Sequence, residues 1–302
     1  MSPSTHLRRV LGLMLILTAA LQAGGSTTDV AASIERLRAQ LQEGRVKDWT
    51  LREVALCRDP LAVNILLEIL AGPESLRYKG LADPVFIHAV RGLGLIQDSG
   101  AIPELQRFLA SRLGADTLPP DAMPFGESGS PGWKVNLERT SEALEASLAL
   151  YALGDWRTSL PAFEALVSNE STAPNHHLWR AAELSTEHYA SDAEAMDSIA
   201  AYLKRSCNGP FLRVQAGAAL SLATLDPDCS FETSSRLIAS GPDESPQSPN
   251  FLVHPKRVAI NALVANPSAR ADQLLRELMT SGSALVQAEA KAALARAGRG
   301  VE

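Results

Sequence analysis

Histidines and glutamates gather in one stretch of the chain, where their side chains could act as zinc ligands. His176 and His177 are followed by Glu183, Glu187 and His188. A zinc ion requires three or four N, S or O ligands that converge at about 2.0–2.3 Å. On a continuous helix His177 and His188 would lie about three turns apart, and adjacent His176 and His177 would point in different directions. The spacing therefore predicts surface or capping roles for these histidines and no bound metal.

A row of carboxylates also has helical spacing. Glu138, Glu142 and Glu145 follow one another at intervals of four and three residues, which places them on one side of a helix. A glycosidase or a metal site could use such a row, but a charge run on an amphipathic helix is usually its solvated face. The segment GESGS at 126–130 approaches the G-x-S-x-G nucleophile motif, but Ser130 replaces the final Gly. We therefore predict no catalytic residue.

The chain has three cysteines, Cys57, Cys207 and Cys229. Cys207 is predicted to end one helix and Cys229 to follow the next, which puts them roughly 20 Å apart at opposite ends of an antiparallel pair. A disulfide requires Cα atoms within about 7 Å. Cys57 could cross-link only between chains, or if the N-terminal segment folds back. We therefore expect free thiols and no disulfide.

The elements that must position these side chains are predicted to be helices. Aromatic residues make up only 5% of the chain, which is rich in Ala and Leu, and this bias suits closely packed helices. No segment alternates with period two for long enough to indicate a sheet. The net charge of −6, with no stretch dense in Lys and Arg, argues against a nucleic-acid partner.

One pattern recurs along the chain: an apolar, Ala-rich helix, a short turn near Asp or Pro, and a second apolar helix. The units lie at 86–111, 143–168, 180–205, 214–239 and 257–282, with a partial one at 284–298. Alignment of the small residue in each first helix gives Ala89, Ala146, Ala182, Ala218, Ala259 and Ala290. After the first step, which contains an insertion, the steps are 36, 36, 41 and 31 residues. Such periods are typical of two-helix repeats.

Over roughly residues 60–298 this pattern resembles the HEAT-repeat family. The resemblance implies an all-α fold, a right-handed α-solenoid of antiparallel helix pairs with about five to six repeats. We expect the solenoid to span 24–302. Its first part, 24–70, departs most from the pattern, because Gly44 and Asp48-Trp49 interrupt it, and is interpreted as an N-terminal cap.

The first residues resemble a targeting segment. His6, Arg8 and Arg9 precede an apolar run from Val10 to Leu21, and small residues follow. This order is typical of a secretory signal peptide, which we place at 1–23, and the run is too short to span a bilayer comfortably. We expect export to the periplasm or the exterior and no stable membrane span after removal of the signal. Retention of this segment as an N-terminal anchor is the alternative.

Long connections between the units are predicted to line one edge of the solenoid. They lie at 71–83, 113–135, 169–177 and 240–255. Insertions on one side of a repeat protein often mark its binding face. These connections carry the candidate binding residues Tyr78, Phe125, Trp133 and Phe251, which are aromatic and thus suited as anchors. Each could equally tuck into the solenoid and hold its loop.

These patterns favour an exported HEAT-like scaffold that binds a protein partner, with no catalysis of its own and no cofactor. This hypothesis rests on analogy of fold. Two alternatives remain open: a module that binds a small ligand or a metal, and a HEAT-like lyase or enzyme accessory protein.

Overall fold

The computed structural model describes residues 27–44, 46–73, 76, 85–113, 131–167, 182–240 and 255–298. Within these ranges the regular elements are thirteen α-helices and three 3₁₀ turns, with no strand, which confirms the all-α expectation. None of these helices is long and apolar enough to cross a membrane. The chain divides into two compact units, the N-terminal unit (Gly24–Pro174) and the C-terminal unit (Asn175–Glu302).

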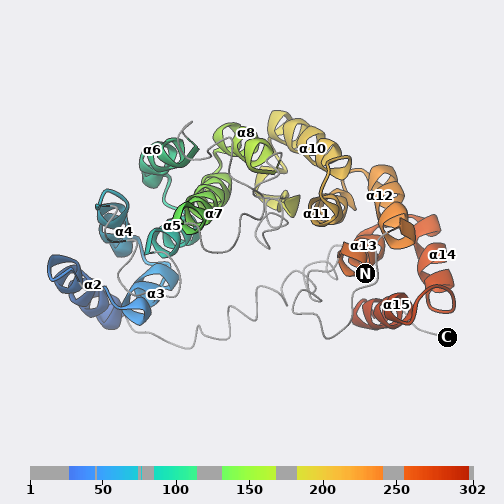
Figure 1. The fold of residues 1–302 in the computed structure, drawn as a ribbon, viewed down its shortest axis with the longest axis horizontal. Helices are drawn as coiled ribbons and strands as arrows, with labels where there is room; N and C mark the ends of the chain where they lie inside the picture. The colour runs from blue at the N-terminus through green and yellow to red at the C-terminus, as the bar shows by residue number, and fades with distance from the viewer. Residues whose placement is uncertain are drawn as a thin grey trace. The chain divides into compact units, whose positions relative to one another are not determined.

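The N-terminal unit is built from a row of helices with a second row packed on it. Its helices are α2 (Thr27–Gln42), α3 (Asp48–Leu56), α4 (Val63–Leu70), α5 (Val85–Ile96), α6 (Ile102–Leu113), α7 (Pro131–Ala152) and α8 (Trp156–Val167), with the 3₁₀ turns η1 (Pro60–Ala62) and η3 (Ser99–Ala101). The row α3, α5, α7 packs side by side (Figure 1). Helix α4 packs on α5, and α6 and α8 both pack on α7.

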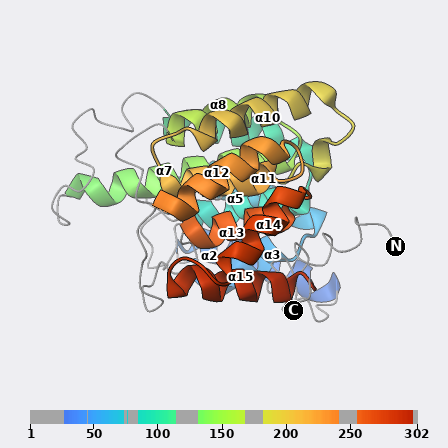
Figure 2. The same cartoon turned by 90° about the vertical axis from the view of Figure 1, so that its right-hand side faces the viewer.

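The C-terminal unit repeats this arrangement. Its helices are α10 (Ala193–Cys207), α11 (Leu212–Leu222), α12 (Pro227–Ser240), α13 (Pro255–Ala265), α14 (Ala269–Leu278) and α15 (Ala284–Arg296), with the 3₁₀ turn η5 (Glu187–Tyr189). Helices α11, α13 and α15 pack in sequence, and α10, α12 and α14 cover them (Figure 2). Large apolar residues of α12 to α15 form the core, among them Ile260, Leu263, Leu275 and Leu294.

Small residues let the helices approach closely, as their positions predict. The six aligned alanines are completely buried: Ala89, Ala146, Ala182, Ala218, Ala259 and Ala290. A Cβ atom added at Gly92 of α5 would lie 2.9 Å from the Cα of Ala55 in α3. A Cβ added at Gly94 would lie 3.1 Å from the Cα of Ala149 in α7. The backbone of α5 is therefore held against both neighbours in its row.

An aspartate closes the turn before the second helix in five of the pairs, whereas Ser268 caps α14. The carboxylate accepts a hydrogen bond from a backbone amide two or three residues later: Asp59 from Leu61 at 2.9 Å, Asp98 from Gly100 at 2.8 Å, Asp155 from Thr158 at 3.2 Å, Asp192 from Ala195 at 3.0 Å and Asp226 from Cys229 at 3.0 Å. Such bonds satisfy the free amides at a helix start. In the N-terminal unit the residue before each aspartate has a positive φ, at Arg58, Gln97 and Gly154.

Helix α10 shows how local sequence sets these elements. Asp192 caps its first turn, and Glu194 there suits the positive end of the helix dipole. Lys204 and Arg205 occupy the last turn, where cations are favoured. Apolar residues spaced three and four apart, such as Ile199 and Leu203, form its buried face.

Two boundaries test the predicted helix pattern closely. The expected interruption is confirmed at Gly44, because α2 ends at Gln42 and Gly44 has a φ of 65°, but it is wrong at Asp48-Trp49, where α3 begins. The expected helix at the start of the unit 180–205 is wrong for 183–189, where the only regular structure is the turn η5. Ser185 and Thr186 precede this turn, and such residues favour turns because their hydroxyl groups compete for backbone bonds.

Candidate functional site

The aromatic residues predicted to bind a partner are mostly outside the described ranges. Tyr78, Phe125 and Phe251 lie there, as do His176 and His177. Trp133 was expected in a loop spanning 113–135, and this placement is wrong, because α7 begins at Pro131. Proline suits the first position of a helix, since its ring fixes φ and its missing amide hydrogen is not needed there. Nothing is described of the Trp133 side chain.

A group of exposed apolar side chains lies on α3 and η1 instead. Trp49, Leu56 and Leu61 are 52%, 54% and 63% exposed. Trp49 and Leu56 are seven residues apart on α3, and this spacing puts them on the same face of the helix. We call Trp49, Leu56 and Leu61 the apolar patch. Large exposed apolar residues that gather within a short segment are typical of interaction sites.

Polar side chains of α2 and α3 border Trp49. The Arg36 guanidinium lies over the Trp49 ring, 5.3 Å from its centroid. Arg36 also donates to the Ser33 hydroxyl at 2.6 Å, and Ser33 donates to the Glu53 carboxylate at 2.7 Å. One face of the ring is therefore covered by the arginine of a polar cluster, and about half of the Trp49 surface stays open to solvent. Aromatic anchors with a polar rim are the usual anatomy of a binding interface.

Sequence reasoning missed the apolar patch because it searched the long loops for aromatic residues. A signal was nevertheless present in α3. Leu51, Val54 and Ala55 form the buried face of this helix, so Trp49 and Leu56 are apolar residues outside that face. A short surface helix needs one apolar face to pack against the core of its own chain. A second apolar face is therefore available for contact with another molecule.

The carboxylate row on α7 lies in the interior, and its expected role as a solvated face is wrong for two of its members. Glu142 accepts a hydrogen bond from the Arg112 Nε at 2.7 Å, and the side chains are 0% and 7% exposed. The Arg112 guanidinium also lies 4.4 Å from the centroid of the Phe108 ring. A buried charge requires a partner, which is why an arginine of α6 meets this carboxylate. The third carboxylate, Glu138, has no described side chain.

A second ion pair joins α5 to the same row. Arg91 donates to the buried Glu145 carboxylate at 2.7 Å. Charged hydrogen bonds thus tie α7 to both α5 and α6. Such pairs fix the register of the helices, and we assign Glu142 and Glu145 this structural role.

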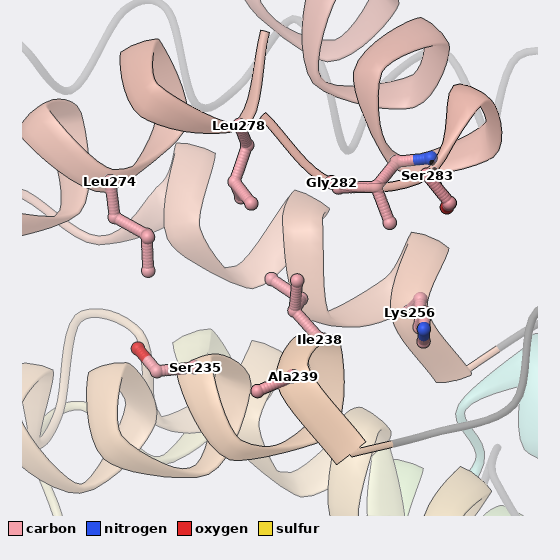
Figure 3. A pocket seen from close by; sticks show the side chains of 9 residues that line it. Ser235, Ile238, Ala239, Lys256, Leu274, Leu278, Gly282 and Ser283 are labelled. Atoms are coloured by element: carbon pink, nitrogen blue, oxygen red, sulfur yellow. Dashed lines mark hydrogen bonds between the residues drawn. The ribbon is translucent and has the colours of Figure 1, made fainter. Parts of the chain in front are cut away.

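The C-terminal unit contains a pocket of about 490 Å³ between α12 and α14. Figure 3 shows Leu274 and Leu278 pointing from α14 toward α12, and Ile238 pointing from α12 toward α14. The lining is mostly apolar, with Lys256 at the start of α13. One hydroxyl of the lining, that of Ser235, donates to its own helix, to the Phe231 carbonyl at 2.8 Å. The pocket is therefore chemically suited to a small apolar molecule.

No group of three or more His, Cys, Asp or Glu side chains within the described ranges is placed to hold a metal ion. Of the residues in the predicted histidine cluster, Glu187 and His188 are exposed on η5. The His188 ring meets the buried Tyr189 edge-on, with 5.2 Å between the ring centroids. This contact fits the surface role expected for His188.

The expected separation of Cys207 and Cys229 is wrong. Cys207 ends α10 and Cys229 lies in the first turn of α12, and Arg236 of α12 donates to the Cys207 carbonyl at 2.6 Å. The sequence argument placed Cys229 at the far end of the pair, but α10 and α12 also contact each other directly, and Lys204 near the end of α10 pairs with Asp226 just before α12 at 2.7 Å. Burial, which disfavours the thiolate, raises the pKa of the Cys207 thiol to about 12. All three cysteines are free thiols in this structure.

Comparison of the chain with family models, with curated proteins and with solved structures found no match in any of the three.

Proposed function

We propose that this protein is an exported HEAT-like scaffold that binds a protein partner through the apolar patch of Trp49, Leu56 and Leu61. The observation that carries the proposal is the exposure of these three large apolar side chains beside a polar rim. Tryptophan at such a position is the residue type that most often dominates binding energy.

The solenoid architecture is part of the proposal. It is supported by the recurring aspartate turns, the six buried alanines and the two-row packing within each unit. Stacked helix pairs bury their apolar faces against neighbours, so large apolar residues at a free surface are available for a partner. Export rests on the predicted signal peptide and places the partner in the periplasm or outside the cell.

Site-specific photo-cross-linking tests the proposal. A photoreactive amino acid replaces Trp49 in one variant, Leu56 in a second and Arg107 in a third. Arg107 is the matched control, because it is an exposed residue of α6 in the same unit. We expect cells that make the protein to yield one discrete adduct from positions 49 and 56 and none from position 107.

A competition variant makes the test specific for the patch. Leu61→Ser removes the exposed apolar side chain of the patch that follows Leu56 in the sequence, and surface substitutions of this kind usually change stability by no more than about 0.5 kcal/mol. The adduct from position 49 should weaken strongly in this background while circular dichroism stays unchanged. Equal adducts at positions 49 and 107, or an adduct indifferent to Leu61→Ser, would show that the patch is not the binding surface.

The pocket in the C-terminal unit favours a second candidate function, the capture of a small apolar ligand. Its volume and apolar lining are within the range of ligand sites. Ala239 lines the pocket and is exposed, so Ala239→Trp should fill it without disturbing the core. We expect an apolar fluorescent dye to bind the parent and a Glu232→Trp control, and to bind Ala239→Trp at least tenfold more weakly. Equal affinity for all three proteins would exclude the pocket as the dye site.

A further inference from the structure

We propose that Cys207 and Cys229 are an oxidative modification site, a dithiol that closes to a reversible disulfide between the end of α10 and the start of α12. Burial and the neighbouring Cys229 thiol both raise the pKa of the Cys207 thiol, which indicates that the two side chains are neighbours. The inference is independent of the proposed partner binding.

Three contacts hold the two helix ends together around the thiols. The Lys204 ammonium lies 2.7 Å from the Asp226 carboxylate, directly before α12. Asp226 in turn accepts from the Cys229 amide at 3.0 Å, which fixes the first turn of α12. The Arg236 guanidinium donates to the Cys207 carbonyl at 2.6 Å. The last turn of α10 is thereby aligned along the first turns of α12.

The position of Cys229 on α12 also supports closeness of the two cysteines. Cys229 and Arg236 are seven residues apart and so lie on one face of α12, and Arg236 of this face contacts the Cys207 carbonyl. Cys207 is completely buried, while Cys229 is half-buried. A reagent from solvent therefore reaches Cys229 first. Cys207 is shielded from solvent and can attack only the sulfur of Cys229.

The oxidant is a small disulfide such as oxidised glutathione. The Cys229 thiol loses its proton and attacks one sulfur of this disulfide, whose S–S bond breaks and releases one glutathione thiol. Cys229 then carries a mixed disulfide. The Cys207 thiol loses its proton, attacks the Cys229 sulfur and displaces the second glutathione. One protein disulfide and two glutathione thiols are formed from one protein dithiol and one oxidised glutathione.

The disulfide would enclose α11. The cross-link restricts the unfolded chain between positions 207 and 229, and closure of loops of this size typically raises stability substantially. For a protein of this length we expect the oxidised form to melt about 5–10 °C higher than the reduced form. An oxidising compartment, which export would provide, favours the closed form.

Thiol counting by mass spectrometry tests the proposal. The purified protein is incubated with oxidised glutathione, quenched in acid, denatured and alkylated. We expect two of the three thiols to be lost, a peptide cross-link between Cys207 and Cys229, and retention of the Cys57 thiol. Dithiothreitol should restore all three thiols and reverse the rise in Tm.

Two variants separate the steps. Cys57→Ser should still form the cross-link, whereas Cys229→Ser should leave Cys207 protected from glutathione in the folded protein. Because Cys229 is half-buried, its replacement leaves the core intact, so loss of reaction there is not explained by unfolding. Three results would overturn the proposal: alkylation of all three thiols, a stable glutathione adduct at Cys229 without the cross-link, or an intermolecular disulfide through Cys57.

Discussion

The two units have similar helix pairs but hold them together by different interactions. In the N-terminal unit, α7 carries the buried carboxylates of Glu142 and Glu145, each paired with an arginine from another helix. In the C-terminal unit, the central helix α13 packs through apolar residues such as Ile260 and Leu263. A charged contact of this helix, between Arg257 and Glu289 of α15 at 3.1 Å, retains some exposure to solvent.

The difference matters because the two kinds of interaction fail differently. A buried ion pair is directional, and loss of one partner leaves a charge with neither water nor a counter-ion. Apolar packing is not directional, and its loss leaves a cavity whose cost depends on how far the neighbours relax. The first unit should therefore depend on a few charged residues, and the second on the summed packing of many.

The largest effect is expected at the buried ion pair. Glu142→Gln removes the negative charge beside Arg112 and should lower the free energy of unfolding by about 3–5 kcal/mol, measured in urea. Arg107→Met breaks an exposed pair with Glu104 on the same helix as Arg112 and should cost no more than about 1 kcal/mol. Equal losses in the two variants would contradict the distinction between buried and exposed charge.

A double substitution sharpens this result. Arg112→Met combined with Glu142→Leu removes both charges and keeps a similar apolar volume. We expect the double variant to regain much of the stability lost by either single one, because no unpaired buried charge remains.

The matching test in the C-terminal unit is a substitution that leaves a cavity in the core. Leu275→Ala should lower the free energy of unfolding by about 2–5 kcal/mol, since Leu275 is completely buried among the core residues. Leu275→Met keeps the volume and should cost less than about 1.5 kcal/mol. A loss for Met as large as that for Ala would show that shape, and not lost burial, sets the cost.

Substitution of the two glycines of α5 by alanine should lower the stability by less, and more at Gly92 than at Gly94. An added Cβ at Gly92 meets both the Leu66 side chain at 2.8 Å and the Ala55 backbone at 2.9 Å. Gly92→Ala should therefore cost about 1–2 kcal/mol, even though alanine favours a helix by about 1 kcal/mol. Gly94→Ala, with 3.1 Å to Ala149, should cost less. Thermal unfolding of both variants checks the order, and the reverse order would contradict the close approach of α5 to α3.

Alkaline pH should reveal the buried thiol of the C-terminal unit. The pKa of Cys207 is about 12 in the folded protein and 9.0 as a free thiol. The native state therefore keeps its proton while the unfolded chain loses it, so the stability is fully present below pH 9 and falls between pH 9 and 12. Between pH 7.5 and pH 10 the free energy of unfolding should fall by about 1 kcal/mol more in the reduced parent than in Cys207→Ala. Equal pH dependence in urea unfolding would show that this thiol titrates normally.

The smallest effect is expected at a helix cap of the C-terminal unit. The Ser268 hydroxyl accepts from the Ala271 amide at 3.4 Å at the start of α14. Ser268→Ala should cost about 0.5–1 kcal/mol, whereas Ser268→Asp keeps an acceptor and should be nearly neutral. An equal loss in both variants, read from the urea midpoint, would indicate that the hydroxyl does not act as a cap.

Much of the helical framework could be predicted from the sequence, because it depends on local patterns. Apolar residues at three- and four-residue intervals located most helices, and the aligned alanines marked the close contacts that the structure shows. The turns followed from Asp, Gly and Pro. These signals lie within a few residues of the elements they specify.

The rest required contacts between distant residues. Nothing near Glu142 and Glu145 shows that Arg112 and Arg91 will meet them, so a buried pair on α7 has the same local pattern as an exposed charge run. The two cysteines are neighbours because the end of α10 contacts the start of α12, which helix lengths alone do not show. The apolar patch could have been found, since Trp49 and Leu56 lie off the buried face of their helix.

The aspartate turns have a consequence for how the chain acquires its structure during synthesis. Each carboxylate bonds an amide no more than three residues away, so no distant segment is needed to complete the turn. Folds dominated by such short-range contacts form quickly. As the chain emerges from its N-terminus onward, one hairpin of helices can therefore assemble and shield its apolar face against the preceding one before the next has been made.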